Sequence, residues 1–420
     1  MKNKFAVNII QKKFLCLMLF FMIIFTFFSS VYASDKPVIS AGSAILIENS
    51  TSNTVFDKNS NEHLEPASIT KIMTAILTIE NANNLNDIVT VPADAVSSIP
   101  DGYSIAGLLP NEQLSVDELL QVLMVHSAND AANVLAFYID GSIEKFADRM
   151  NSKLSELGLL DSHFTNPSGM HDPNHYSSAH DLAFLMQYCI KNSTFRKYSG
   201  LDSCKISATN LSAERYFENT NYMMSSNSEF YYPYITCTKT GFTSQAKYCL
   251  VSVAEKDDLT YICVVLAVDN SETRFAETKT LLEYGFSNFS FRDIANKDDV
   301  VTQITISNGT DETKNLDLIL ENSVNVFVNN DFSNESVSPQ ILLENLPSAP
   351  IAKNKVLGTA TYVINGKDYV VNLLASHDVE FSASKTYFLQ VCILVIAIIV
   401  LIALLIFLSF KKSDSSELKN

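Results

Sequence analysis

Three short motifs in the sequence carry residue types that can perform acyl transfer. They occur in the order Ser68-Ile69-Thr70-Lys71, Ser127-Ala128-Asn129 and Lys239-Thr240-Gly241. A serine hydroxyl is a weak nucleophile until a neighbouring base takes its proton. Each motif alone occurs by chance in many proteins. Their order, and the structural setting of each, favours one shared site.

Ser68 and Lys71 are the candidate nucleophile and base. An apolar helical repeat follows Pro66, so Ser68 falls in the first turn of a predicted helix with Lys71 on the same face. The positive end of that helix favours negative charge at Ser68. A lysine accepts a proton only if its ammonium is destabilised, and burial or a second cation such as Lys239 would do this. For this motif alone, a capping serine beside a solvated lysine is the alternative.

The second motif lies between two predicted helices, 116–125 and 131–139. From such a break the Ser127 and Asn129 side chains can project toward the nucleophile. A hydroxyl at Ser127 can pass protons between the base and a leaving group, and the Asn129 amide can hold the base and a substrate carbonyl. Serine and asparagine are also favoured as helix N-caps. Asp130 could serve as the cap instead, which would leave both side chains free.

The third motif lies at the end of a predicted strand. Lys239 and Thr240 can bind the terminal carboxylate of a peptide, and Gly241 lets the substrate backbone approach the strand. An oxyanion that forms during acyl transfer needs preorganised hydrogen-bond donors. The backbone N–H groups of Ser68 and Phe242 are the candidates for that role.

Strands are predicted at both ends of the catalytic region, with helices between them. Residues 44–47 and 54–56 are β-prone, while 248–254 and 260–268 form a predicted hairpin that precedes a helix over 273–286. Both kinds of element must bury an apolar face. The pattern therefore predicts an α+β fold, an antiparallel sheet flanked by helices.

After about residue 295 the pattern changes to half-buried strands, and Asn365-Gly366 is a strong hairpin signal. This β-rich region has no candidate catalytic cluster. We expect a signal peptide at 1–33, a catalytic domain at 38–296, a small β-rich domain at 297–376, a linker at 377–387, a transmembrane helix at 388–410 and a short cytoplasmic tail at 411–420.

Both ends of the chain indicate export and anchoring. A lysine-rich start, an apolar run at 14–28 and the pattern Val31-Tyr32-Ala33 are typical of a secretory signal, with Ser34 as the new N-terminus. An uncleaved anchor is the alternative. Residues 391–408 carry no charge and can cross a bilayer core of about 30 Å, and Lys411-Lys412 favour a cytoplasmic C-terminus. The catalytic domain would then lie outside the cytoplasm, tethered to the cell membrane.

Composition excludes several other classes of function. The formal charge of −16 argues against a nucleic-acid partner, whose phosphates would repel the chain. The five cysteines outside the apolar segments are odd in number and include no Cys-x-x-Cys, so neither a complete disulfide framework nor a zinc site is indicated. Histidines and aspartates gather between 163 and 181, but Pro173 prevents His171 and His175 from forming a helical metal pair. We expect no metal and no other cofactor.

The three motifs together resemble those of the low-molecular-weight penicillin-binding proteins, specifically the serine D-alanyl-D-alanine carboxypeptidases. The resemblance covers nearly the whole chain, and two further stretches, 166–170 and 175–179, also resemble family segments. It implies a β-lactamase/transpeptidase-like fold. It also implies an acyl-enzyme with the penultimate D-Ala of a peptidoglycan stem peptide ending in D-Ala-D-Ala, release of the last D-Ala, and acylation of the same serine by β-lactam antibiotics.

The resemblance also assigns roles to the motif residues. Ser68 is the nucleophile, Lys71 the base and Ser127 a proton relay. Asn129 supports the site, and Lys239 with Thr240 binds the substrate carboxylate. One departure is visible, because Lys247 stands where similar proteins usually have a glycine, which puts the local backbone and substrate fit in question.

Three other interpretations remain open. The same fold could cleave crosslinks as a D,D-endopeptidase. A class A β-lactamase needs a glutamate that activates water, and no convincing Glu-x-x-Leu-Asn occurs between Asn129 and Lys239. The third interpretation is an inactive cell-wall-binding homologue, and the three complete motifs argue against it.

Overall fold

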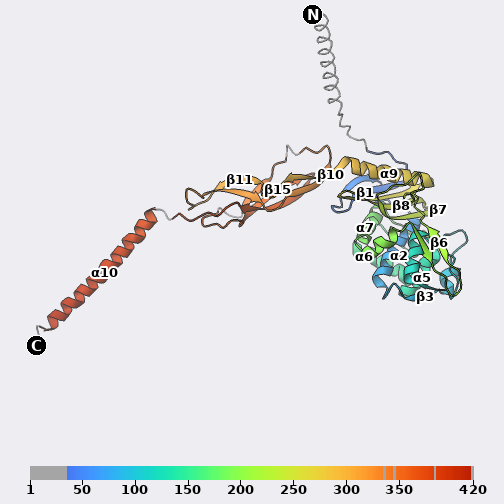
Figure 1. The fold of residues 1–420 in the computed structure, drawn as a ribbon, viewed down its shortest axis with the longest axis horizontal. Helices are drawn as coiled ribbons and strands as arrows, with labels where there is room; N and C mark the ends of the chain where they lie inside the picture. The colour runs from blue at the N-terminus through green and yellow to red at the C-terminus, as the bar shows by residue number, and fades with distance from the viewer. Residues whose placement is uncertain (1–35, 334–336, 344–346, 383–384, 418–420) are drawn as a thin grey trace, which may run out of the picture. The chain divides into compact units, whose positions relative to one another are not determined.

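The computed structural model describes residues 36–333, 337–343, 347–382 and 385–417 (Figure 1). The chain divides into two compact units, Met1–Ser290 and Phe291–Asn420. The segment 1–33, predicted as a signal peptide, lies outside the described residues. Each unit is described by itself.

The first unit is built on a five-stranded antiparallel sheet with the order β2-β1-β9-β8-β7. Strands from the two ends of the unit meet at its centre, where β1 pairs with β9. Strand β7 forms an edge of the sheet. The strands are β1 (Ser43–Glu48), β2 (Thr54–Lys58), β7 (Ile235–Thr243), β8 (Lys247–Lys256) and β9 (Leu259–Val268). The predicted antiparallel sheet flanked by helices is confirmed.

Helices cover both faces of this sheet, with α9 on one side and the other helices on the opposite side (Figure 1). Strands buried on both faces have nearly continuous apolar runs, as β8 and β9 do. The helices of the unit are η1 (Ala67–Thr70), α2 (Lys71–Asn81), α3 (Ala93–Ser97), α4 (Val116–Val125), α5 (Asn129–Asp140), α6 (Ile143–Leu157), α7 (Ala179–Cys189), α8 (Ser193–Ser199) and α9 (Ser271–Asn288). Two small hairpins complete it: β3 (Ile88–Thr90) with β4 (Gln113–Ser115), and β5 (Ser203–Ile206) with β6 (Arg215–Glu218).

Helix α4 spans the residues predicted for it, 116–125. Ser115 and Glu118 form a reciprocal capping box at its start. Helix α5 starts at Asn129, two residues before the predicted start. Between them, Ser127 adopts a left-handed φ of 63° that breaks the helical path.

Helix α2 lies at the centre of the first unit. Every residue from Lys71 to Thr78 is buried, including the polar side chains Thr74 and Thr78. The apolar residues of α2, α4 and α5 belong to one hydrophobic core together with those of the sheet. A polar group buried here must find a protein partner, since water cannot supply one.

The second unit is β-rich, as predicted. Its strands are β10 (Phe289–Ala295), β11 (Val300–Thr305), β12 (Asn315–Leu320), β13 (Val324–Asn329), β14 (Gln340–Leu343), β15 (Val356–Ile364) and β16 (Lys367–Ala375). Five of them form a sheet with the order β11-β12-β16-β15-β14, and β10 pairs with β13. Asn365 and Gly366 both have positive φ and close the β15–β16 hairpin. The β-rich domain was predicted to start at residue 297. The structure divides the two units between Ser290 and Phe291, because β10 pairs with β13 of the second unit.

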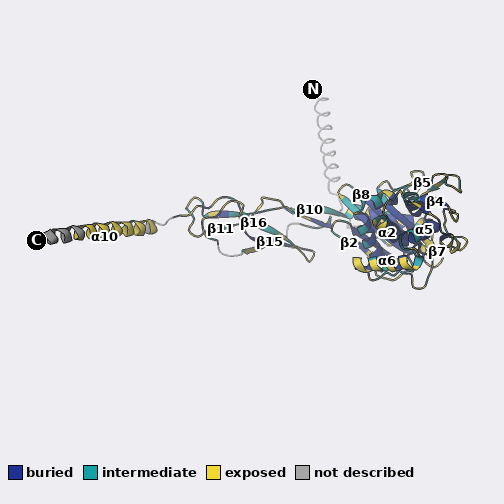
Figure 2. Cartoon of the chain, turned by 90° about the horizontal axis from the view of Figure 1, so that it is seen from below, coloured by how far each residue is buried: buried dark blue, intermediate teal, exposed yellow. Residues whose placement is uncertain are grey.

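Helix α10 (Lys385–Glu417) contains a 22-residue apolar stretch, Tyr387–Leu408, none of which is buried (Figure 2). Within the described ranges it is the one helix long and apolar enough to cross a membrane. Its position agrees with the transmembrane helix predicted at 388–410.

Ending the chain after Ser382 should make the protein soluble without detergent and leave its thermal unfolding unchanged. The reason is that α10 contributes no residue to the hydrophobic cores described for the two units. Circular-dichroism melting of the full chain and the shortened chain in the same detergent is the measurement. A clear fall in melting temperature would show that α10 is more than an anchor.

Candidate active site

Ser68 lies in a strained turn at the entrance to α2. It belongs to the 3₁₀ turn η1, and the preceding Ala67 has a φ of 47°, a left-handed value that is rare for alanine. The other residues of η1, Ala67, Ile69 and Thr70, are buried, whereas Ser68 is half-buried. The turn therefore presents its serine to the pocket and hides its neighbours.

The Lys71 amine contacts three oxygen atoms inside the protein. Its Nζ lies 2.8 Å from Ser68 Oγ, 2.6 Å from Asn129 Oδ1 and 2.7 Å from the Ser168 carbonyl oxygen. The two carbonyl oxygens can only accept hydrogen bonds, so they take both hydrogens of a neutral amine. The lone pair of that amine is then left for the Ser68 hydroxyl. This geometry suits a base that removes the serine proton.

Burial favours that neutral form of Lys71. The pKa of Lys71 lies well below its ordinary value, first because the side chain is completely buried and second because Lys239 is nearby. The Asp130 carboxylate opposes the shift. Burial and Lys239 are the two causes expected from the sequence.

Lys239 is buried in β7, and among the described residues its Nζ donates one hydrogen bond, to the Thr240 carbonyl oxygen at 3.1 Å. Burial lowers the pKa of Lys239 to about 7, and the Arg274 guanidinium contributes. The prediction that this strand ends at the Lys239-Thr240-Gly241 motif is wrong. The strand runs on to Thr243, because the hairpin pairing with β8 continues as far as Thr243 opposite Lys247.

Gly241 brings β7 against the serine turn. A Cβ at this position would lie 2.7 Å from the Pro66 carbonyl oxygen and 3.2 Å from the Ser68 backbone nitrogen. Only a glycine permits so close an approach. The contact brings Ser68 and the Phe242 segment together, as the predicted oxyanion hole requires. The Phe242 side chain itself is exposed and packs on Tyr248, with ring centroids 4.4 Å apart.

Ser127 is buried, and within the described residues its hydroxyl has no hydrogen-bond partner. A buried hydroxyl without a partner is costly unless a ligand supplies one. Asp130 does not cap α5, where the sequence suggested it. The N-cap is Ala128, and the Asp130 carboxylate instead accepts the backbone N–H groups of Ala106 and Leu108. Asp130 therefore fixes a neighbouring loop and leaves Ser127 free.

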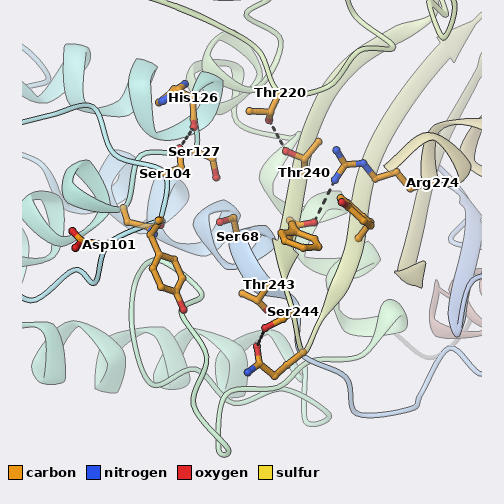
Figure 3. Close-up of a pocket in the computed structure, with 17 residues that line it drawn as sticks. Ser68, Asp101, Ser104, His126, Ser127, Thr220, Thr240, Thr243, Ser244 and Arg274 are labelled. Atoms are coloured by element: carbon orange, nitrogen blue, oxygen red, sulfur yellow. Dashed lines mark hydrogen bonds between the residues drawn. The ribbon is translucent and has the colours of Figure 1, made fainter. Parts of the chain in front are cut away.

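Six of the predicted site residues line one pocket of about 560 Å³: Ser68, Ser127, Asn129, Thr240, Gly241 and Phe242 (Figure 3). Lys71 and Lys239 are buried and do not line it. Ser68 lies at its centre, with Ser127 to one side and Thr240 to the other. The Thr240 hydroxyl is hydrogen-bonded to that of Thr220. The one carboxylate among the described lining residues is Asp101, at the far edge of the view.

Arg274 is a lining residue that the sequence motifs did not reveal. It comes from α9, and its Nη1 lies 3.4 Å from the Gly241 carbonyl oxygen. The guanidinium stacks over the rings of Tyr248 and Phe275, and burial lowers the pKa of Arg274 to about 10. Its position depends on the packing of α9 against the sheet, so no local pattern announces it.

The histidines between 163 and 181 have separate partners. His171 pairs with Glu65, His163 with the Asn174 carbonyl oxygen, and His180 with Asp181. Within the described ranges, no group of three or more potential metal ligands comes together.

Lys247 adopts a left-handed backbone conformation, which favours glycine. Its φ is 58°, which costs a lysine about 1–2 kcal/mol relative to a right-handed conformation. Its side chain extends outward, with Nζ 2.7 Å from the exposed Asp269 carboxylate. The departure thus strains the β7–β8 turn without filling the pocket.

Comparison with known proteins agrees with this geometry. Residues 30–270 match the D-alanyl-D-alanine carboxypeptidase family, which is more than half of the chain. The chain belongs to this family. It is therefore an enzyme of the serine hydrolase type. Residues 289–381 match the C-terminal domain of penicillin-binding protein 5.

Individual members of the family are similar over most of the chain. D-alanyl-D-alanine carboxypeptidase DacF of Bacillus subtilis is 31% identical over 367 residues, 85% of this chain and 92% of that protein. DacC of Escherichia coli is 29% identical over 357 residues, 81% of this chain and 84% of that protein. The crystal structure of penicillin-binding protein 5 from Haemophilus influenzae has a TM-score of 0.63 at 28% identity, covering 83% of this chain and all of that one. The α+β fold is thus that of the family.

Gly169→Ala should be far more damaging than Gly158→Ala. Both glycines have a positive φ, 79° and 73°, so both substitutions carry the same backbone strain. Only at Gly169 would the Cβ collide, at 1.9 Å from the Ala67 carbonyl oxygen, whereas Gly158 has nothing within 4 Å. We expect Gly169→Ala to lower the free energy of unfolding by about 1–3 kcal/mol more than Gly158→Ala. Equal losses in denaturant titrations would contradict this close packing on the serine turn.

Proposed function

We propose that the protein is a serine D-Ala-D-Ala carboxypeptidase that removes the terminal D-alanine from peptidoglycan stem peptides. The observation that carries the proposal is the buried Lys71 amine, which faces Ser68 Oγ while Asn129 and Ser168 accept its hydrogens. Family membership supports it. No cofactor is needed, because side chains of this chain can supply every proton transfer.

Acylation begins when Ser68 Oγ attacks the carbonyl carbon of the penultimate D-Ala. The Ser68 proton moves to Lys71, and the tetrahedral intermediate places its negative oxygen near the backbone N–H groups of Ser68 and Phe242. The C–N bond then breaks. The leaving amine receives a proton that passes from Lys71 through the Ser127 hydroxyl, so D-alanine departs neutral at its nitrogen. Ser127 is suited to this role because its buried hydroxyl lacks a partner among the described residues.

The substrate carboxylate binds at the cationic end of the pocket. Thr240 and Arg274 line that end from β7 and α9, and Lys239, next to Thr240 in β7, is buried near Arg274. Among the residues that the structure describes, no carboxylate pairs with the buried Lys239 ammonium. A bound carboxylate would compensate this charge, and a substrate without one would not.

Hydrolysis of the acyl-enzyme completes the reaction. A water attacks the Ser68 ester, Lys71 again accepts a proton, and Ser68 Oγ takes it back as the ester bond breaks. A β-lactam follows the first step only: Ser68 opens its ring, and the leaving nitrogen stays attached to the acyl group. The same serine is therefore expected to form a stable penicilloyl ester.

The apolar ends support a location at the cell membrane. Helix α10 supplies a span long enough to anchor the protein. We infer that 1–33 is a cleaved export signal and that the catalytic unit works on the extracytoplasmic side, where peptidoglycan is found. The two lysines at 411–412 favour that orientation.

Ser68→Ala should abolish covalent labelling by a fluorescent penicillin and the release of D-alanine from a peptide ending in D-Ala-D-Ala. The substitution removes the only proposed nucleophile and leaves the hydrophobic core intact. Labelling gels and an assay for free D-alanine are the measurements, with a melting curve as control for folding. Labelling of a folded Ser68→Ala protein would refute the assignment. If the parent protein cleaves crosslinked peptide dimers but releases no D-alanine from the linear peptide, it is an endopeptidase instead.

The acylation rate should rise with pH along a limb far below the pKa of free lysine, about 10.4. Burial and Lys239 lower the pKa of Lys71 well below its ordinary value, so the neutral base forms at a lower pH than it would for a free lysine. At higher pH Lys239 loses its proton and carboxylate binding should weaken, since its pKa in the empty site is about 7. The two lysines interact, so the limbs belong to the pair.

Arginine substitutions separate the two lysines. Lys71→Arg should be nearly inactive because a guanidinium stays protonated, while Lys239→Arg should retain more activity because its role needs only a cation. Single-turnover acylation by penicillin across pH is the measurement. If Lys71→Arg is acylated at close to the parent rate, Lys71 is not the base.

A further inference from the structure

His175 is connected to the serine turn by a chain of hydrogen bonds. Its Nε2 lies 2.8 Å from Thr70 Oγ1, and Thr70 Oγ1 donates to the Ala67 carbonyl oxygen at 2.8 Å. The His175 ring is 2% exposed, and Thr70 is fully buried. Ala67 is the left-handed residue immediately before Ser68. The chain therefore ends on the carbonyl group whose orientation sets the direction of the nucleophile's backbone.

The hydrogen bonds determine which tautomer His175 adopts. The backbone N–H of Thr165 points at Nδ1 from 3.1 Å, and a backbone N–H can only donate. Nδ1 must therefore carry a lone pair, and the single proton of the neutral ring is on Nε2. It is directed at Thr70 Oγ1, which in turn directs its own proton at Ala67. Both hydrogen bonds are therefore donated in the same direction, from His175 to Thr70 and from Thr70 to Ala67.

Burial keeps His175 neutral. Burial lowers the pKa of His175 to about 4, and the Asp172 carboxylate opposes this shift. Protonation would put a second N–H against that of Thr165 and a cation near the base. At neutral pH the ring therefore donates a hydrogen bond from Nε2 to Thr70 and accepts one at Nδ1 from Thr165.

The same segment also holds the base. Lys71 binds the Ser168 carbonyl oxygen, and Gly169 packs so closely on Ala67 that no Cβ fits between them. An isolated β-bridge joins Ser177 to Leu64, just before the serine turn. The loop around 166–177 thus contacts the backbone on which the nucleophile depends as well as the amine that activates it.

We propose that His175 is a positioning residue which, acting through Thr70, holds the Ala67–Ser68 turn in the conformation that reacts. The inference rests on the proposed acylation of Ser68. A positive φ at alanine is unfavourable and persists only where surrounding contacts impose it. The Thr70–Ala67 hydrogen bond is such a contact, and His175 orients its donor. Without the relay, the turn relaxes and Ser68 Oγ moves away from Lys71.

Substitutions at Thr70 test the relay with little change of volume. Thr70→Val removes the hydroxyl, and Thr70→Ser keeps it. We expect Thr70→Val to slow acylation on the order of tenfold to a hundredfold, the range that a displaced reacting group produces, and Thr70→Ser to stay close to the parent. Thr78→Val is the matched control, because Thr78 is equally buried in α2 but donates to Thr74, away from the turn. It should lower the melting temperature and leave the acylation rate unchanged.

Substitutions at His175 separate its two nitrogens. The amide nitrogen of His175→Gln can reach the position of Nε2 and donate to Thr70, whereas His175→Asn can replace only Nδ1 and accept from Thr165. We expect His175→Gln to be acylated several-fold faster than His175→Asn. A residue that served only for stability would show no such order once both proteins are compared at temperatures well below their melting points.

The measurement is the rate constant of acylation by a fluorescent penicillin, on the full chain in detergent, with melting temperatures recorded alongside. Slow acylation of Thr70→Val and His175→Asn, with rescue in Thr70→Ser and His175→Gln, supports the proposal. It is overturned if Thr70→Val or His175→Asn reacts as fast as Thr78→Val, or if Thr70→Ser is as slow as Thr70→Val. A parent protein that is never labelled at Ser68 would instead refute the proposed function, so the two failures can be told apart.

Discussion

The burial of the Lys71 amine away from solvent is the constraint on which the rest of the catalytic unit depends. Lys71 begins a helix in which every residue as far as Thr78 is buried, and its own side chain is completely buried, so its nitrogen has no access to bulk water. A charged amine there would be costly, and a neutral one needs acceptors for its hydrogens. Asn129 and Ser168 supply them from two distant parts of the chain. Helix α5 and the 166–170 loop must therefore pack on α2 to supply both acceptors of the proposed base.

The edge strand β7 supplies the second half of the site. Its Gly241 touches the serine turn, and its buried Lys239 adds the cation that helps to keep Lys71 neutral. An edge strand also has one side free of sheet pairing, where an extended peptide can lie. One element thus combines contact with the proposed nucleophile, a positive charge and an open backbone edge. This explains why the three motifs need a sheet assembled from both ends of the unit.

The site stores several unfavourable features at once. Ala67 and Ser127 have positive φ, Ser127 Oγ has no described partner, and two lysines are buried close together. Each would cost stability in an ordinary core, and such strain persists only where the surroundings impose it. Dense apolar packing of the helices and sheet around α2 compensates. The hydrogen bonds from His175 through Thr70 to Ala67 also help to offset the unfavourable backbone conformation of Ala67.

The sequence by itself determined the elements with strong local signals and the chemistry of the motifs. Helix α4 was predicted with its observed bounds because its apolar repeat is local, and the hairpin at Asn365-Gly366 because its two residues suit a tight turn. The partners expected for Ser68 followed from the chemical needs of a serine nucleophile. Only the tertiary structure decided that β7 extends past its motif, that Asp130 anchors a loop, and that Arg274 and His175 join the site. These depend on contacts between residues far apart in the chain, and such contacts leave no periodic or local trace in the sequence.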